Sequence, residues 1–203
     1  MKLLIATSNP GKLVEVREIL DGLELELISL ADLGLAAPEE PFATFQENAA
    51  AKATACAARA SLWTLADDSG LCVDALDGGP GVRSARFADS DEARRRRLLE
   101  HLRAIPPGQR GAHFFCAVAL ASPDGQRIFR AEGRVDGQIA LVPRGAGGFG
   151  YDPLFLPDEA PGRTLAELEP AEKNRLSHRG RALQRLRPLL LHGLAREGDL
   201  PGR

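Results

Sequence analysis

The pattern of apolar and polar residues along the chain alternates between short apolar runs and longer stretches with helical spacing. Runs of apolar residues predict five strands, at residues 2–6, 24–28, 62–66, 112–121 and 126–135. Apolar side chains three or four positions apart, bounded by capping or breaking residues, predict four helices, at residues 13–20, 44–60, 90–103 and about 169–191.

A cluster of polar residues directly follows the strand predicted at residues 62–66. It reads Asp67-Asp68-Ser69-Gly70, and we expect the two carboxylates to lie at the end of that strand. Adjacent side chains of an extended segment point to opposite sides, so Asp67 and Asp68 are predicted to have different functions. One could bind a metal or orient a water while the other stabilises the loop. The alternative is an Asp-Ser-Gly turn that closes a hairpin, in which residues 70–76 pair back.

The first strand leads into a turn that precedes a helix. The free N–H groups at a helix N-terminus and the helix dipole make such a turn suitable for binding an anion, and Lys12 adds a positive charge. The spacing of a Walker phosphate-binding loop is absent. The alternative is an ordinary Pro-Gly turn at the start of a helix. The candidate anion-binding residues are Thr7, Ser8, Asn9, Pro10, Gly11 and Lys12.

The alanine-rich helix predicted at residues 44–60 has a clear start and one unusual charge. Thr44 is the expected N-cap, and Glu47 completes the pattern of a capping box. Asn48 and Lys52 are four residues apart and share a face. Lys52 either extends to solvent along the alanine surface or faces a bound anion.

A glycine-rich stretch near residue 150 carries two aromatic side chains, Phe149 and Tyr151. Exposed aromatic residues between glycines are suited to holding a planar ring. The alternative is that they anchor a long loop to the core.

Composition limits the class of protein. The 203 residues fit one domain or two closely joined lobes, and a hydrophobic fraction of 44% is enough for a sizeable core. A net charge of −2 gives no overall attraction to nucleic acid or membrane. Three widely spaced cysteines indicate a reducing compartment, and no apolar run approaches the length of a membrane span, so we expect a soluble cytoplasmic protein. Residues 193–203 are expected to be a frayed tail.

The use of lysine and arginine is uneven. Only four of the 26 basic residues are lysines, and three of them lie near asparagines: Lys12 near Asn9, Lys52 near Asn48, and Lys173 beside Asn174. Lysine and arginine are not interchangeable where a compact ammonium meets phosphate oxygens, so these pairs could mark one site; the alternative is chance under a composition bias. The run Arg94–Arg97 spreads around its helix and is expected to be a solvated face rather than a nucleic-acid patch.

Together these stretches resemble the inosine triphosphate pyrophosphatase family, whose members hydrolyse non-standard purine nucleoside triphosphates such as ITP, dITP and XTP to the monophosphate and pyrophosphate. Five motifs in family order carry the resemblance: residues 7–12, Phe45-Gln46-Glu47-Asn48 with Lys52, residues 67–71, residues 148–153, and Glu172-Lys173-Asn174 with Ser177-His178-Arg179-Gly180.

The resemblance implies a two-lobed, three-layer α/β fold at residues 1–192, with a long mixed sheet and a central substrate cleft. It also implies a homodimer, Mg²⁺ as cofactor, Glu40 and Asp68 as metal ligands, and Asp68 as proton acceptor. A metal lowers the pKa of a carboxylate that binds it, so we expect Asp68 to orient water rather than to take its proton. The implied substrate-binding residues are the 7–12 turn with Lys52, Ser69, Phe149, Gly150, Tyr151, Asp152, Lys173, His178 and Arg179.

The sequence is also compatible with two other functions. A non-catalytic sensor of purine nucleotides could use the same pocket, and an RNA-binding module could use Arg94–Arg97. Release of pyrophosphate that depends on a metal would distinguish the enzyme from both.

Overall fold

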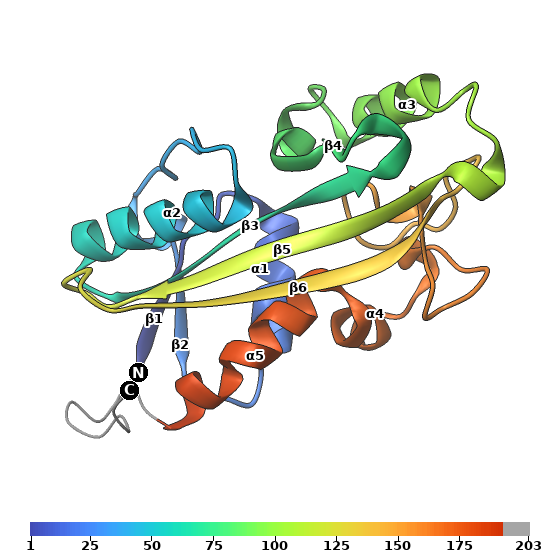
Figure 1. Cartoon of the computed structure of the whole chain (residues 1–203). Coiled ribbons are helices and arrows are strands. Elements are labelled where there is room, and N and C mark those ends of the chain that lie inside the picture. Colours follow the sequence, from blue (N-terminus) through green and yellow to red (C-terminus); the bar gives the residue numbers. More distant parts are fainter. Residues whose placement is uncertain (193–203) are drawn as a thin grey trace.

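The computed structural model describes residues 1–192 and shows one mixed sheet with helices on both faces (Figure 1). The strands are β1 (Lys2–Ile5), β2 (Glu26–Ser29), β3 (Trp63–Val73), β4 (Gly79–Pro80), β5 (Gly111–Ala121), β6 (Ile128–Ile139) and β7 (Phe155–Pro157). The α-helices are α1 (Pro10–Ile19), α2 (Phe45–Ala60), α3 (Asp91–His101), α4 (Pro170–Leu176) and α5 (His178–His192). Among the short 3₁₀ helices, η3 (Gly81–Arg86) lies beside β3.

The sheet has the strand order β2-β1-β3-β5-β6-β7, with β4 paired to β3. β1 is parallel to β2 and to β3, whereas β3, β5, β6 and β7 are joined by antiparallel pairs. The central strands are long: the ladder between β3 and β5 runs from Thr64 to Val73 on β3. The prediction of a long mixed sheet is therefore confirmed.

Two lobes share these long strands. At the end that holds β1 and β2, helix α2 covers one face of the sheet and helices α1 and α5 cover the other, which gives three layers (Figure 1). At the opposite end, α3 and the segments around β7 form a separate core cluster with the far halves of β3, β5 and β6. Leu71, Leu98 and Tyr151 belong to this second core.

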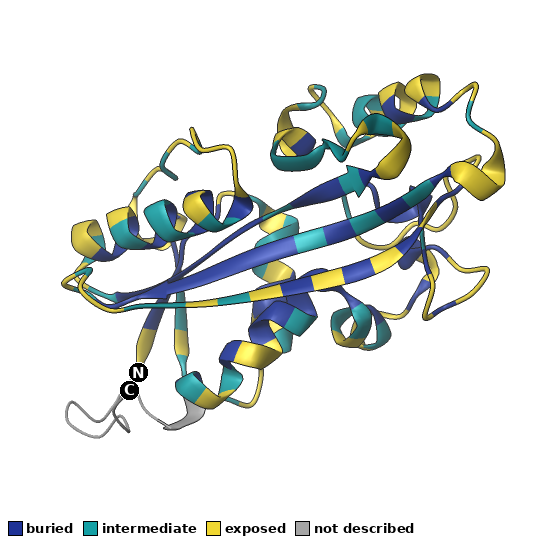
Figure 2. Ribbon diagram, viewed as in Figure 1, coloured by how far each residue is buried: buried dark blue, intermediate teal, exposed yellow. Residues whose placement is uncertain are grey.

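Burial along the strands shows how the sheet is covered. β3 and β5 are buried over most of their length, while β6 alternates between buried and exposed residues in the part that reaches Ile139 (Figure 2). β3 is therefore covered on both faces, and polar side chains on it must find partners inside the protein.

The prediction that a strand ends before Asp67 is wrong, and so is the alternative turn at Asp-Ser-Gly. β3 continues through Asp67, Asp68 and Ser69 to Val73, because β5 pairs with the whole segment. Residues 70–76 do not form the return strand of a hairpin; Gly79–Pro80 pairs back on Cys72 and Val73 instead. Gly70 allows η3 to approach, since a Cβ there would lie 2.6 Å from Ser84 Oγ.

The helix expected near the C-terminus is two helices. Ser177 has extended backbone angles and separates α4 from α5. Its Oγ accepts a hydrogen bond from the Gly180 N–H at 3.0 Å, which is the contact of a helix N-cap. The break turns the chain, so that Lys173 and Arg179 approach the site from two different helices.

Several other helix and strand boundaries differ from the predicted ones by a few residues. α1 begins at Pro10 rather than Leu13, with Asn9 as its N-cap. The second strand starts at Glu26, and β6 continues to Ile139. The N-cap role of Thr44 is confirmed, since its Oγ1 accepts from the Glu47 N–H at 3.2 Å.

No helix within residues 1–192 is long and apolar enough to cross a membrane. The predicted frayed tail, residues 193–203, lies outside the described residues.

Candidate active site

Asp67 and Asp68 lie on opposite faces of β3, as the sequence predicted. Leu65, two residues before Asp67, packs in the core under α1 and α5, whereas Ala66, two residues before Asp68, packs under α2. Each carboxylate is therefore part of a different group of polar residues. Both are almost completely buried, at 6% and 4% exposure.

Asp67 is held by two cations. Its Oδ2 lies 3.0 Å from Lys12 Nζ and accepts hydrogen bonds from Arg179 Nε and Nη2 at 3.2 and 3.0 Å. Burial alone would raise the pKa of Asp67, but the charges of Lys12 and Arg179 hold it well below its ordinary value. Asp67 is thus ionised and links the start of α1 to the start of α5.

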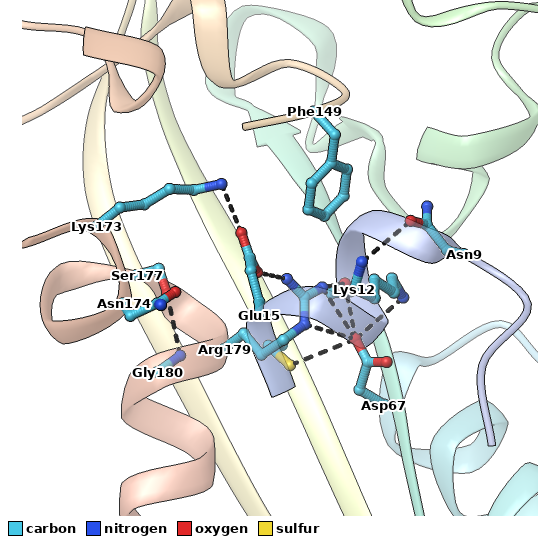
Figure 3. A network of polar contacts seen from close by, with 12 residues as sticks. Asn9, Lys12, Glu15, Asp67, Phe149, Lys173, Asn174, Ser177, Arg179 and Gly180 are labelled. Atoms are coloured by element: carbon cyan, nitrogen blue, oxygen red, sulfur yellow. Dashed lines mark hydrogen bonds and ion pairs between the residues drawn. The ribbon is translucent and has the colours of Figure 1, made fainter. Parts of the chain in front are cut away.

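A chain of buried ion pairs extends from Arg179 (Figure 3). Arg179 Nη1 donates to Glu15, and Glu15 also accepts from Lys173 Nζ. Lys173 in turn donates to Asp152 at 2.6 Å. Burial opposes the charge on Lys173, but Asp152 and Glu15 raise its pKa above the ordinary value. The charges in this network of ion pairs cancel, because it holds three acidic and three basic side chains: Asp67, Glu15 and Asp152 with Lys12, Arg179 and Lys173.

A pocket opens beside this chain, between the two lobes. Its wall includes Phe149, His178 and Arg179 together with the polar residues Asn9, Lys12 and Ser69. The Phe149 ring is partly exposed, and its centroid lies 5.1 Å from Lys173 Nζ and 5.7 Å from Arg179 Cζ. Gly11 gives this ring room, because a Cβ there would lie 2.6 Å from Phe149. An aromatic face and cations at one opening suit a planar, polar ring.

Tyr151 does not share the exposure predicted for both aromatics. Only 4% of its surface is exposed, and its hydroxyl donates to the Ser84 carbonyl at 3.1 Å. Tyr151 packs in the core of the second lobe and so fixes the loop that carries Phe149. Phe149 faces the pocket and Tyr151 anchors the loop, so the two predicted alternatives each describe one residue.

His178 lines the pocket in its neutral form. Its ring stacks on Phe114 with the centroids 4.6 Å apart, and its Nδ1 has no hydrogen-bond partner within residues 1–192. Burial and the nearby charges of Arg179 and Lys173 place the pKa of His178 well below 6.5. A buried nitrogen without a partner is rare in folded proteins, and a bound ligand would supply one.

A second polar group lies on the other face of β3. Asp68 Oδ2 accepts a hydrogen bond from Asn48 Nδ2 at 2.9 Å, and Lys52, which is 5% exposed, donates to Glu40. Burial and the negative charge of Glu40 raise the pKa of Asp68. The carboxylates of Glu40 and Asp68 repel each other, and that of Asp68 is deeply buried. Such a pair is suited to binding a divalent cation that prefers oxygen ligands.

The structure places the predicted residues in two neighbouring groups. Within residues 1–192 no set of three or more His, Cys, Asp or Glu side chains is arranged for metal binding, so a cation at Glu40 and Asp68 would complete its shell with ligand oxygens and water. Lys12 lies between the groups, since it pairs with Asp67 and its charge also acts on Asp68. Thr7 and Ser8 precede α1, Pro10 is the first residue of this helix, and all three lie outside the pocket wall.

Several pocket residues escaped sequence reasoning. Glu15 lies between the apolar positions of α1 and carries no motif, although its spacing of three from Lys12 places both on one face. Arg94 lines the pocket although its run of arginines predicts a solvated face, and Asp91, at the start of the same helix, lines it too. Phe114 and Ser84 are single residues in apolar or mixed stretches and carried no pattern.

Comparison with known proteins gives a consistent result. The sequence profile of the Ham1 family matches residues 3–189. A dITP/XTP pyrophosphatase of Geobacter sulfurreducens is 50% identical over 190 residues, which cover 92% of this chain and 94% of that protein. A dITP/XTP pyrophosphatase of Rhodopseudomonas palustris is 48% identical over 205 residues, or 95% of this chain and 97% of that protein.

Solved structures agree with the sequence matches. A HAM1 protein from Coxiella burnetii superposes with a TM-score of 0.85 at 40% identity, and the match covers 95% of this chain and all, or 100%, of the other. A nucleoside-triphosphatase (dITP/XTP pyrophosphatase) from Mycobacterium abscessus gives a TM-score of 0.70 at 46% identity over 93% and 100% of the two chains.

Proposed function

The chain belongs to the Ham1 family, and from this we propose that it hydrolyses non-standard purine nucleoside triphosphates (dITP, ITP and XTP) to the monophosphate and pyrophosphate. One observation supports this reaction most strongly. A pocket with an aromatic face lies against one side of β3, and two carboxylates with a buried lysine lie on the other side. The base of a nucleoside triphosphate would need the first environment and its phosphates the second, and the two must lie close together.

The pocket is suited to a 6-oxo purine. Phe149 would stack on the ring, and the unpaired Nδ1 of His178 would find a hydrogen-bonding atom on the base. Four of the five N–H groups of Arg179 are already used by Asp67, Glu15 and Ser69, which leaves one for a base oxygen. Because Glu15 and Asp152 balance the charges of Arg179 and Lys173, this part of the site favours a neutral base over a phosphate.

The phosphates would lie toward Lys12 and Lys52. Lys12 stands in the first turn of α1, where backbone N–H groups and the helix dipole favour an anion. Lys52 is buried and charged: burial disfavours its charge, but Asp67 and Glu40 raise its pKa. Positioning and charge neutralisation are the main requirements of phosphoryl transfer, and these two ammonium groups provide both.

We propose that Mg²⁺ binds at Glu40 and Asp68. Bound there, the ion would neutralise negative charge on the phosphates as pyrophosphate leaves. The neighbouring side chains hold these ligands in place: Asn48 donates to Asp68, and Lys52 donates to Glu40. Asp68 would also orient the attacking water, since its carboxylate is fixed on a rigid strand.

A sensor that binds purine nucleotides without cleaving them remains the second candidate, because the pocket alone would serve it. The two functions differ in their products. An enzyme converts dITP to dIMP and pyrophosphate, which chromatography of the reaction mixture detects, whereas a sensor returns dITP unchanged. Release of single phosphate instead of pyrophosphate would contradict the proposed bond cleavage.

We further propose that the protein is a cytoplasmic homodimer. Its described cysteines, Cys56, Cys72 and Cys116, are free thiols, which is typical of proteins from a reducing compartment. The dimer is proposed from the family resemblance alone. Light scattering on the purified protein tests it, and a mass near the 21.7 kDa of one chain would contradict it.

A further inference from the structure

Helix α3 is hydrogen-bonded to the loop that carries Phe149, through both the backbone N–H and the backbone carbonyl of Gly150. The Gly150 N–H donates to Asp91 Oδ2 at 2.7 Å, and the Gly150 carbonyl accepts from Arg95 Nη1 at 2.7 Å. Asp91 is itself held by Arg94, whose Nη1 lies 2.6 Å from Asp91 Oδ1. Asp91 and Arg95 are four residues apart on one face of α3, and we call their two hydrogen bonds to Gly150 the clamp.

Three glycines of this loop have no side chain that could hold it in place. Gly145, Gly148 and Gly150 all adopt positive φ angles, where glycine is the favoured residue. No atom lies within 4 Å of the place where a Cβ of Gly150 would be. Gly150 has no side chain to pack, so the two hydrogen bonds from α3 hold it together with the adjacent Tyr151, whose ring is packed in the second core.

Helix α3 is a firm support for the clamp. Ser90 caps its N-terminus by accepting from the Ala93 N–H at 3.2 Å. Leu98 and Leu102 at its other end are completely buried in the same core cluster as Tyr151. The clamp therefore joins the loop to the second lobe on one side of Phe149, while Asp152 holds the Phe149 N–H at 2.8 Å on the other.

We propose that Asp91 and Arg95 are positioning residues that hold Phe149 where it can stack on the purine base. This proposal rests on the function proposed above. Phe149 would contact the base equally in the bound substrate and in the transition state, so loss of the clamp weakens binding rather than chemistry. The expected effect of Arg95→Ala is a rise of about tenfold in KM for dITP, with kcat changed by less than about twofold.

A double-mutant cycle tests whether the clamp acts through Phe149. Arg95→Ala is made in the natural protein and in a Phe149→Ala background, and KM and kcat for dITP are measured for all four proteins. Arg96→Ala is the matched control, because Arg96 lies on the same helix, contacts Glu100 at 3.9 Å and is 68% exposed. Arg95→Lys keeps a donor and should restore part of the affinity.

The proposal predicts that Arg95→Ala raises KM in the natural protein and has no further effect once Phe149 is absent. An equal rise in both backgrounds, or a loss of kcat at unchanged KM, would overturn it. Arg95→Gln replaces Arg95→Ala if the alanine variant does not fold.

Hydrogen exchange without nucleotide separates this proposal from the proposed function. The clamp predicts amide exchange in residues 145–151 at least about fivefold faster in Arg95→Ala than in Arg96→Ala, since an N–H whose restraint is lost opens more often. Unchanged exchange overturns the clamp even if dITP is hydrolysed. Absence of dITP hydrolysis by the natural protein would refute the proposed function, and the exchange result would still decide whether the clamp exists.

Discussion

Asp67 and Asp68 are consecutive residues of β3 whose carboxylates contact different helices. Asp67 lies 3.0 Å from Lys12 of α1 and 3.0 Å from Arg179 of α5, whereas Asp68 accepts a hydrogen bond from Asn48 of α2 at 2.9 Å. The strand thereby separates a charge-balanced pocket from an acidic pair beside a buried lysine. Substitutions on the two faces should have different consequences.

Asp68→Asn should abolish turnover while the fold stays intact. The amide keeps the shape of the side chain but removes the charge proposed to bind the cation and to orient water, and such losses cost orders of magnitude in rate. Pyrophosphate release and thermal unfolding measure the two effects separately. Activity within about tenfold of the natural enzyme would remove Asp68 from the catalytic role.

Lys52→Arg should lower kcat/KM at least about tenfold. The Lys52 side chain is only 5% exposed and its compact ammonium pairs with Glu40, so the larger, planar guanidinium should not fit there. Arg96→Lys, on the exposed face of α3, is the control and should leave kcat/KM unchanged. Equal tolerance of both substitutions would show that the retention of lysine at position 52 has no functional meaning.

Arg179→Ala should reduce both stability and discrimination between bases. It leaves Asp67 and Glu15 buried with one fewer cation, and breaking a buried ion pair typically costs about 3–5 kcal/mol of the free energy of unfolding. Urea unfolding measures that loss. If the remaining N–H of Arg179 reads a base oxygen, the ratio of ITP to ATP hydrolysis should also shrink. A large loss of stability with an unchanged ratio would restrict Arg179 to a structural role.

Stability should depend on pH through His178. Its pKa lies well below 6.5 in the folded protein, because of burial and the charges of Arg179, Lys173 and Lys12, which outweigh the opposing effect of Asp67. The unfolded chain therefore binds the proton first, and stability is lost as the pH falls below about 6.5, by up to about 1.4 kcal/mol per pH unit.

His178→Gln is the variant that isolates this effect. Its free energy of unfolding should change less steeply between pH 6.5 and 5 than that of the natural protein. His113 contributes the same slope to both proteins, so the difference reports on His178 alone. Identical slopes would mean that His178 does not titrate as its buried position requires.

The sequence predicted the helices and most strands well, because their apolar spacing is regular. It also predicted that motifs far apart along the chain gather in one place, and the network from Lys12 to Asp152 joins residues from α1, β3, α4 and α5. The continuity of β3 escaped prediction, since Asp67, Asp68 and Ser69 interrupt its apolar run. Their charges and hydroxyl are tolerated there because their partners come from distant helices, which no local pattern reveals.

Other features depend on single contacts and were equally hidden. At the break between α4 and α5, the Ser177 side chain accepts a hydrogen bond from the start of α5. The helical spacing of apolar residues continues across this break and therefore does not indicate it. Glu15 looks like any surface glutamate until Lys173 and Arg179 are brought beside it. Phe149 lies between two glycines and Tyr151 follows the second of them, yet Tyr151 is buried in the second core whereas the Phe149 ring is partly exposed in the pocket.

The central claim is that the pocket selects 6-oxo purines and that the acidic pair works with Mg²⁺. We propose that a 6-oxo group accepts a hydrogen bond from the pocket. The 6-amino group of ATP would place a donor against a donor and leave buried groups unpaired, at about 1–3 kcal/mol for each mismatch. GTP shares the 6-oxo group and differs from XTP in carrying a 2-amino group in place of the 2-oxo group, so slower release from GTP would report on the 2-position of the base.

One assay tests this claim most directly: pyrophosphate release from ITP, dITP, XTP, GTP and ATP, each with Mg²⁺ and with a chelator in its place. The account predicts rapid release from ITP, dITP and XTP, much slower release from GTP, the lowest or nearly the lowest rate with ATP, and loss of activity with the chelator. Equal rates for ATP and ITP, or full activity without a divalent cation, would contradict it.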